Sequence, residues 1–446
     1  MAEQAVRLQL LMGPGIAVPV PRAVLDAVQE VKVESNSGET QSGFEITFRI
    51  SNRSPLQTLF LLTGGAGIPF LRVVIAVTLG GETTVLMDGV MTHHEIRSDT
   101  GPTATMVVKG KDSSVFMDFV PLDGLPYPAM TPAVRVLVAL AKYAALGIVP
   151  LVIPSVLEDL PIPIERIPRH QGTDYAYIKS LAHDAGYVFY IDPGPVPGVS
   201  KAYWGPEIRI GAPQHALNAA LDEPHANVKS LSFRFDKERK ELPIVFIQEP
   251  TTKVPIPIPI PDVTPLNPPL GVVPPLPPKL KFLNDTAKLN PLVAAMRGLA
   301  YAGQHSDSVF GTGSLDVQRY GHVLKARQLV GVRGAGEAFD GLHYVSSVSS
   351  SLKRGEFTQS FSLARNALLS TVTIFGLQFG FLVGGAIVIE TVFALPGTGQ
   401  LLIQSITARD YPVVQAITVV SAVLVILVNL VVDLSYSFLD PRVTYE

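Results

Sequence analysis

Apolar and polar residues alternate along much of the first 120 residues of this 446-residue chain. The alternation is clearest in residues 44–51, 71–81, 83–98 and 103–112, which turn-forming Gly, Asn, Asp and Ser separate. Because successive side chains of a strand point to opposite faces, this period of two predicts half-buried strands. The region is therefore expected to be a β-barrel or sandwich, and not a series of alternating strands and helices.

Helical periodicity appears next, in two stretches. Residues 131–148 predict a helix that Arg135 and Lys142 make unsuitable for crossing a bilayer. A second helix is expected after Thr173 or Asp174, either of which can cap it. Gly186 can end that helix in a left-handed turn, and the apolar residues that follow read as a buried strand.

Twelve prolines fall between residues 250 and 278. Proline lacks the amide donor and fixes φ, so this segment is predicted to be polyproline II or a loosely tethered loop, and neither a helix nor a sheet interior. A spacer between two folded halves is the favoured interpretation, and a ligand for an aromatic-groove domain is the alternative. Alternating strands resume over residues 323–363, with a hairpin turn expected at Asp340-Gly341.

The last eighty residues differ in kind. Between Arg365 and Glu390 lie 24 uncharged residues, and between Asp410 and Asp433 lie 22. A helix rises about 1.5 Å per residue, so each stretch is long enough to cross a hydrocarbon layer about 30 Å thick. The sequence predicts two transmembrane spans joined by a loop that bends at Pro396.

Composition narrows the possible functions. A net charge of -3 and a pI near 6.3 give no basic excess, so nucleic acid is not expected as a partner. The chain has no cysteine, which excludes disulfides and thiolate chemistry and fits a reducing compartment. The first residues do not resemble a signal peptide, and the body is expected to be cytoplasmic.

Candidate chemistry is sparse. His93, His94 and Glu95 resemble metal ligands, but adjacent strand residues point to opposite faces, so the two histidines are interpreted as solvated or close to a turn. The other histidines considered, none with metal-ligand spacing, are His183, His215, His225, His305, His322 and His343. No catalytic, cofactor-binding or metal site is therefore predicted, and the chain is not expected to be an enzyme.

Several further motifs are assigned to structure. The glycines interpreted as loops or bulges, and not as a nucleotide loop, are Gly331, Gly334 and Gly336, and also Gly64, Gly65 and Gly67. Gln378, Asn429, Glu390 and Asp433 could contact a substrate within or beside the spans, although helix packing and interfacial positions are favoured. Gly376, Gly380 and Gly384 recur every four residues and indicate a close-packing helix face.

Residues 1 to about 366 resemble the late control protein D family, the baseplate hub of contractile phage tails and related injection systems. The resemblance rests on the order and spacing of QGTDYAYIKSLAHDAGYVFYID, YWGPEIRIG, ALNAALDEPHANVKSLSFRFD and YGHVLKARQLVGVRGAGEAFDGLHYVSSVSSSLKRGEFTQSF. It implies a homotrimer in which each subunit supplies two barrel-like β-domains, so that the trimer adapts a trimeric spike to a hexameric inner tube. The implied partners are the spike, the inner tube and other baseplate proteins.

Residues 365–446 resemble the C-terminal end of an oligopeptide or dipeptide ABC-transporter permease, through ETVFALPGTG, ARDYPVVQ and LDPRVTY in that order. The cytoplasmic coupling loop of such a permease should precede RNALL, where this chain has the strand-like GEFTQSFSLA. Transport by this chain alone is therefore not expected. The short string shared by both families suggests a gene fusion, either natural or an artefact of sequence assembly.

The predicted architecture is mainly β with short helices, followed by a transmembrane hairpin. The expected domains are a first β hub domain (1–125), a helical and αβ middle segment (126–249), a Pro-rich insert (250–280), the completion of a second β hub domain (281–366) and a membrane hairpin (367–446). The expected function is a baseplate hub assembled in the cytoplasm, with a lipid anchor through residues 367–439. The alternative is a truncated permease subunit with a foreign N-terminal region.

Overall fold

The protein was analysed as a computed structural model. It describes residues 6–38, 40–51, 70–98, 103–155, 161–164, 167–219, 226–236, 241–248, 255–260, 279–283, 286, 291–305, 307–336, 339–366, 397–420 and 423. The chain divides into two units, residues 1–270 with 278–366, and residues 271–277 with 367–446.

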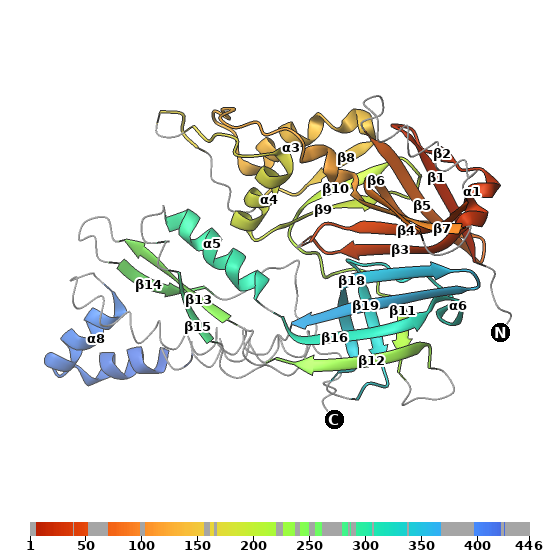
Figure 1. Ribbon diagram of the computed structural model, residues 1–446. Coiled ribbons are helices and arrows are strands. Elements are labelled where there is room, and N and C mark those ends of the chain that lie inside the picture. Colours follow the sequence, from red (N-terminus) through yellow and green to blue (C-terminus); the bar gives the residue numbers. More distant parts are fainter. Residues whose placement is uncertain are drawn as a thin grey trace. The chain divides into compact units, whose positions relative to one another are not determined.

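One 13-stranded sheet dominates the first unit (Figure 1). Its order is β12-β16-β19-β18-β3-β4-β7-β6-β5-β1-β2, and β17 joins β18 to β11. The N-terminal strands are β1 (Arg7–Pro14), β2 (Val18–Pro19), β3 (Val28–Asn36), β4 (Gly43–Ser51), β5 (Leu71–Leu79), β6 (Glu82–Ser98) and β7 (Thr103–Asp112), with α1 (Arg22–Ala27) between β2 and β3. The C-terminal elements are β11 (Gln214–Asn218), β12 (Val228–Phe235), β16 (Asp307–Asp316), α6 (Val317–Tyr320), β17 (Leu329–Arg333), β18 (Gly341–Lys353) and β19 (Glu356–Asn366).

The strands of the two β regions pair with one another. β3 pairs antiparallel with β18, from Asn36 opposite Ser347 to Glu30 opposite Lys353. One apolar core accordingly contains residues of both regions, among them Phe48 and Phe361. The expectation of a mainly β fold is confirmed. The described strands form one 13-stranded sheet and no closed barrel, while the division into two β-domains stays a prediction.

A smaller αβ layer lies between the two β regions in sequence and has its own core around Trp204. It contains the 3-10 helices η1 (Ser113–Met117) and η2 (Ala144–Leu146), the helices α3 (Pro132–Ala141) and α4 (Asp174–Ala185), and the strands β8 (Ile148–Val152), β9 (Val188–Pro193) and β10 (Ser200–Gly205). β10 pairs with β8 in parallel and with β9 antiparallel. Both predicted helices form, although α3 ends earlier than expected.

The caps of α4 follow the sequence prediction. The Thr173 hydroxyl accepts a hydrogen bond from the amide of Ala176, and Gly186 adopts φ +67° at the C-cap. β9 follows directly, as the apolar run predicts. The β17–β18 hairpin also forms, but Val332 pairs with Gly341, so its loop is longer than the two-residue turn expected at Asp340-Gly341.

The proline-rich region is part of a second, three-stranded sheet in the order β14-β13-β15. Its elements are β13 (Glu241–Gln248), β14 (Pro255–Pro259), β15 (Lys279–Leu283) and the helix α5 (Pro291–Gln304). The predicted polyproline II or loop conformation is thus wrong for residues 255–259. These residues form an edge strand, which is the position in a sheet where proline is tolerated.

The second unit contains α8 (Thr398–Thr407) and a helical stretch over residues 411–420. Within the described part of the chain, no helix has the length and apolar character needed to cross a membrane. The first predicted span from residue 367 onward, and the second beyond residue 423, lie outside the described residues. The same holds for His225, the glycines at 64, 65, 67, 376, 380 and 384, and Gln378, Glu390, Asn429 and Asp433.

Candidate functional site: three buried arginines and a capped helix

Arg72 joins the first β region to the middle layer. From β5, its guanidinium forms a bidentate pair with Asp88 of β6, at 2.7 Å from Nε to Oδ1 and 2.8 Å from Nη2 to Oδ2. It also donates to the backbone carbonyls of Leu146 at 3.1 Å and Gly198 at 2.9 Å. Arg72 and Asp88 are 6% and 2% exposed, so this fork is a buried connection across sequence-distant segments.

Arg327 connects three parts of the fold. Its Nη1 lies 2.5 Å from Oδ1 of Asp192 in β9, and its Nε donates to the carbonyl of Asn36 in β3 at 2.9 Å. The guanidinium also lies 4.1 Å from the centre of the Tyr190 ring, within the range of a cation–π contact. Arg327 adopts φ +65°, a strained conformation for a non-glycine residue.

Arg209 forms the third connection, between the middle layer and β16. It pairs with Glu207 at 2.7 Å and with Asp307, and its guanidinium lies 4.9 Å from the Tyr344 ring centre. Burial alone would lower the pKa of Arg209, but the two carboxylates outweigh burial and raise that pKa well above its usual value. The arginine is therefore a fixed cation inside the fold.

The three arginines have a common geometric role. A planar guanidinium offers five donors in a rigid fork, so a buried arginine fixes the relative orientation of the groups that it binds. Buried ion pairs contribute little net stability, because desolvation offsets the attraction, yet losing one partner is costly. The arrangement therefore fixes how the β regions and the middle layer fit together.

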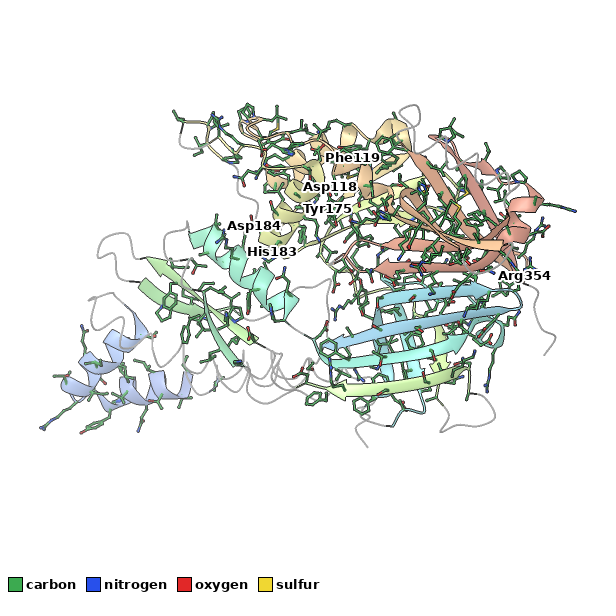
Figure 2. The ribbon with its side chains drawn as sticks, in the orientation of Figure 1. Asp118, Phe119, Tyr175, His183, Asp184 and Arg354 are labelled. Atoms are coloured by element: carbon green, nitrogen blue, oxygen red, sulfur yellow. The ribbon has the colours of Figure 1, made fainter. Side chains whose placement is uncertain are left out.

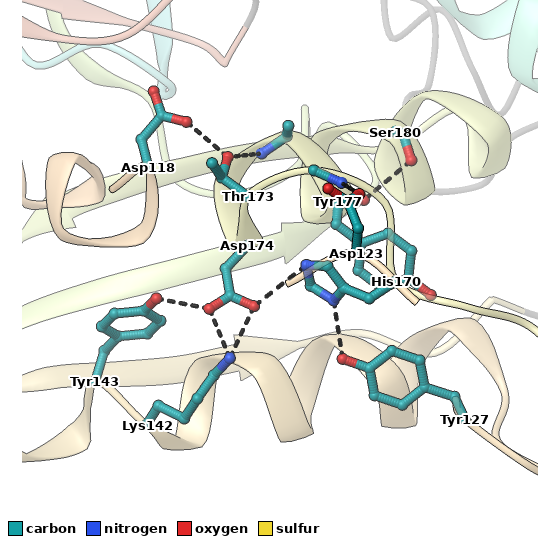
Figure 3. Close-up of polar contacts among 12 residues, drawn as sticks. Asp118, Asp123, Tyr127, Lys142, Tyr143, His170, Thr173, Asp174, Tyr177 and Ser180 are labelled. Atoms are coloured by element: carbon teal, nitrogen blue, oxygen red, sulfur yellow. Dashed lines mark hydrogen bonds and ion pairs between the residues drawn. The ribbon is translucent and has the colours of Figure 1, made fainter. Parts of the chain in front are cut away.

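A polar network surrounds the start of α4 (Figure 3). The Asp174 carboxylate lies 2.6 Å from Lys142 Nζ, accepts a hydrogen bond from the Tyr143 hydroxyl at 2.6 Å, and is 3.6 Å from His170 Nε2. The other ring nitrogen of His170 bonds the Tyr127 hydroxyl at 3.0 Å. Burial lowers the pKa of His170, while Asp174 opposes that shift. A carboxylate is favourable at this helix end because it faces the positive end of the helix dipole.

A cavity of about 1250 Å³ lies between α4, α5 and the second β region. Arg209 and Tyr344 contribute to its lining, and apolar walls come from Phe189, Leu299 and Phe310. Near its rim, His183 Nδ1 lies 3.4 Å from the Gln304 amide nitrogen, and Figure 2 shows His183 and Asp184 at the end of α4 that meets α5. The ion pairs already engage the Arg209 guanidinium, so the cavity mainly offers apolar contact.

The histidines considered in the sequence are dispersed. His93 and His94 are exposed on β6, and Glu95 beside them pairs with Arg97, whose hydrogen bond lowers the pKa of Glu95. His215 and His322 stack with ring centres 3.6 Å apart. Over the described ranges, no group of three His, Asp or Glu side chains is arranged to hold a metal ion. Gly334 and Gly336 have positive φ in the β17–β18 loop, as the hairpin interpretation predicts.

Comparisons with solved structures identify the fold of the first unit. A tail protein from Neisseria meningitidis MC58 superimposes with a TM-score of 0.53 at 12% identity, covering 81% of this chain and 96% of that protein. The 43 kDa tail protein of prophage MuSo2 from Shewanella oneidensis gives 0.54 at 12% identity, covering 81% and 98%. A PdpA-VgrG complex gives 0.53 at 9% identity, covering 81% and 65%. The first unit has the fold of phage tail proteins.

The C-terminal region matches a different family. Residues 360–445 match the family described as binding-protein-dependent transport system inner membrane component. The oligopeptide transport system permease protein AppB of Bacillus subtilis is 51% identical over 81 residues, which is 18% of this chain and 26% of that protein. The glutathione permease GsiC of Escherichia coli is 51% identical over 82 residues, or 18% and 27%. The chain thus spans about a quarter of the length of these relatives, and both resemblances predicted from the sequence are confirmed.

The three arginine connections were not found from the sequence. Their distant partners Asp88, Asp307 and Asp192 lie 16, 98 and 135 positions away in the chain, so no local motif marks these connections. Arg72 offered a weak signal, because it is the only charge in the apolar run of residues 71–79.

Proposed function

We propose that this chain is the baseplate hub of a contractile, phage tail-like injection system. The similarity to tail proteins over 81% of the chain supports this proposal. The proposed hub is a homotrimer that adapts a trimeric spike to a hexameric inner tube, and it has a structural role without catalysis. The buried arginines fit this role, because an adaptor between two symmetries must keep its subdomains in fixed orientation.

We also propose where the hub is located in the cell. The particle assembles in the cytoplasm, and the permease-like residues 367–439 anchor the hub to a lipid bilayer as a two-span hairpin. The sequence match to inner membrane components supports the anchor.

Co-assembly of the full chain with its tube and spike proteins tests the hub. We expect the detergent-solubilised chain to have the mass of a trimer by light scattering, and to enter tube-capped particles together with the spike. A monomeric mass together with absence from the particles would contradict the proposal. A mixture with an unrelated hexameric ring protein serves as the control.

The second candidate is a truncated peptide permease with a foreign N-terminal region, favoured by 51% identity to AppB over 81 residues. Against it, residues 356–366 form β19, which pairs with β18 on one side and β16 on the other. A strand held in a sheet occupies the position where a permease needs its coupling loop. Stimulation of a partner ATPase by the reconstituted chain would favour the permease and contradict a purely structural role.

A further inference from the structure

Among the described elements, only the helix α5 packs on the small sheet β14-β13-β15, and it covers one face. α5 packs closely there, since a Cβ added at Gly298 would lie 2.7 Å from Ile260 Cγ1 and 2.8 Å from Val245 Cγ1. The Tyr301 hydroxyl of α5 also donates to the Glu241 carboxylate. Glu241 and Val245 therefore mark the covered face.

The opposite face, called the bare face below, is apolar on all three strands. The pairing register places Leu242 opposite Leu280, Ile244 opposite Phe282, and Phe246 opposite Pro257, so these six side chains share that face. Leu280 and Phe282 are 53% and 52% exposed. Sheets with one solvated face normally carry polar side chains on it, whereas strands buried on both faces are apolar throughout. The composition of the bare face is therefore that of a surface in contact with another apolar surface.

The prolines restrict how a partner can reach this sheet. Ile260 donates its amide hydrogen to the Pro243 carbonyl, which places the amides of alternate residues 256 and 258 on the inner side of β14 as well. Pro255, Pro257 and Pro259 occupy the alternate outward positions and have no amide hydrogen. A partner strand cannot add to the β14 edge, which leaves the β15 edge and the bare face for contact with a partner.

The chemistry of the bare face favours lipid over protein. Three strands of about five residues present roughly 240 Å², so two such faces would bury about 500 Å², below the roughly 1,200 Å² of a stable protein interface. The six side chains also have no hydrogen-bonding group, although protein interfaces usually form about one hydrogen bond per 100–200 Å². A lipid acyl region requires neither large area nor polar complementarity.

The edge strand β15 carries positive charge beside the bare face. Its sequence alternates Lys279, Leu280, Lys281 and Phe282, and both lysines are exposed. When Leu280 and Phe282 enter the acyl region, the alternation directs the lysine side chains away from it, to the level of the phosphates. We propose that the bare face is a peripheral binding surface for anionic phospholipid, separate from the C-terminal anchor.

Photo-crosslinking of the full chain tests this site. The probe is a vesicle of equal parts phosphatidylcholine and phosphatidylglycerol that contains a phospholipid with a diazirine in its acyl chain. We expect lipid adducts within residues 279–283 at several times the level found on the outward face of α3. That face is the internal control, because Val134, Leu137 and Val138 are apolar and 42%, 42% and 43% exposed. Adducts at or below the α3 level would overturn the proposal.

A paired substitution tests the charge contribution. Each lysine near an anionic surface contributes about a fivefold gain in binding, so Lys279→Gln with Lys281→Gln should lower the adducts at 279–283 about 25-fold. Lys201→Gln, an exposed lysine on β10, is the matched control and should leave them unchanged. Equal adducts in the double variant and the control would count against anionic lipid.

Self-association is the competing outcome. If the bare face instead binds a second copy, mass should rise with concentration without lipid, and Phe282→Ser should abolish the rise. That result would overturn the lipid proposal, provided that hydrogen exchange in α5 shows the variant folded. Entry into tube-capped particles is measured separately, so failure of the lipid site leaves the hub proposal standing.

Discussion

Loss of the Arg72 side chain should strongly lower the free energy of unfolding. Arg72→Ala leaves the Asp88 carboxylate, 2% exposed, without its cation. An uncompensated buried charge costs about 3–5 kcal/mol, so we expect a loss of that size in the free energy of unfolding, measured by urea denaturation.

The double variant Arg72→Met with Asp88→Leu is the control for this cost. Removing both charges restores most of the lost stability, because replacing a whole buried ion pair by apolar groups is often nearly neutral. A single variant as stable as the parent protein would show that Asp88 is not isolated by burial.

His343 gives a pH dependence. Burial lowers the pKa of His343 to about 4, and its Nε2 lies 2.7 Å from the Phe339 carbonyl, which the neutral ring can satisfy as a donor. The unfolded chain, with a pKa near 6.5, binds the proton first as pH falls. The stability due to neutral His343 is therefore present above about pH 6.5 and is lost toward pH 4.

Between pH 7.5 and 5 this loss amounts to about 2 kcal/mol, measurable by urea unfolding at each pH. His343→Gln keeps a donor near the Phe339 carbonyl and removes the titration, so its stability should change less over this interval. An unaltered pH slope in the variant would assign the effect to other groups.

The residue scale is also where sequence reasoning failed most clearly. Arg209 and Asp307 are 98 positions apart, and only the three-dimensional pairing of β16 brings them together. By contrast, His93 and His94 could be assigned to solvent from strand geometry alone, and both are exposed. Adjacent residues in the sequence determine which way the side chains of a strand point, but they do not identify the partners of long-range ion pairs.

At the scale of elements, Gly186 sets the distance between α4 and α5. A Cβ at this position would lie 2.4 Å from Ala300 Cα, and the residue has φ +67°. Gly186→Ala should therefore cost about 1–2 kcal/mol for the left-handed conformation, with a further cost as α5 is displaced. Hydrogen exchange should become faster across residues 291–304.

Gly172→Ala separates the two causes. Gly172 has φ +72°, but its nearest neighbour to an added Cβ, the Ala176 side chain, is 3.6 Å away. This variant should show the backbone cost without faster exchange in α5. Equal exchange in both variants would mean that α5 does not depend on contact with Gly186.

The prolines of β14 should keep its outer edge from pairing with another strand. Replacing Pro255, Pro257 and Pro259 by valine restores three outward amide hydrogens and exposes a pairing-competent edge. We expect sedimentation to detect oligomers that the parent protein does not form. Ile256→Val is the control, because it alters the same strand without adding a donor, and it should leave the distribution unchanged.

The sequence correctly predicted those helix ends at which a residue type is favoured for a single physical reason. Thr173 and Gly186 mark the ends of α4 because capping and left-handed φ each favour those residues. It failed at residues 255–259 because proline was read only as a breaker. Prolines at every second position leave the amides of the intervening isoleucines able to pair with one neighbouring strand. This alternation of proline and isoleucine is the signal that predicts an edge strand.

For the whole molecule, the boundary near Asn366 was predictable, but the continuity of the sheet before it was not. The change from alternating to uncharged sequence marks the end of β19 within one residue, and the permease match begins inside that strand at residue 360. The pairing of β3 with β18 joins segments about 315 positions apart, as in Ser350 opposite Val33. Alternation fixes which face of a strand is buried, but it does not select the partner strand.

The membrane anchor gives the last prediction. If residues 367–439 cross a bilayer as two helices, alkaline carbonate should leave the full chain in the membrane pellet, because high pH removes proteins held by charge and leaves inserted helices in place. A chain ending at Asn366 retains all of β19 and should appear in the supernatant, since the proposed lipid contact at the bare face is peripheral and does not cross the bilayer. Release of both chains would exclude the two-span hairpin while leaving the hub assignment intact. Retention of both would show that the first unit itself holds the membrane, so that the C-terminal residues are not needed for it.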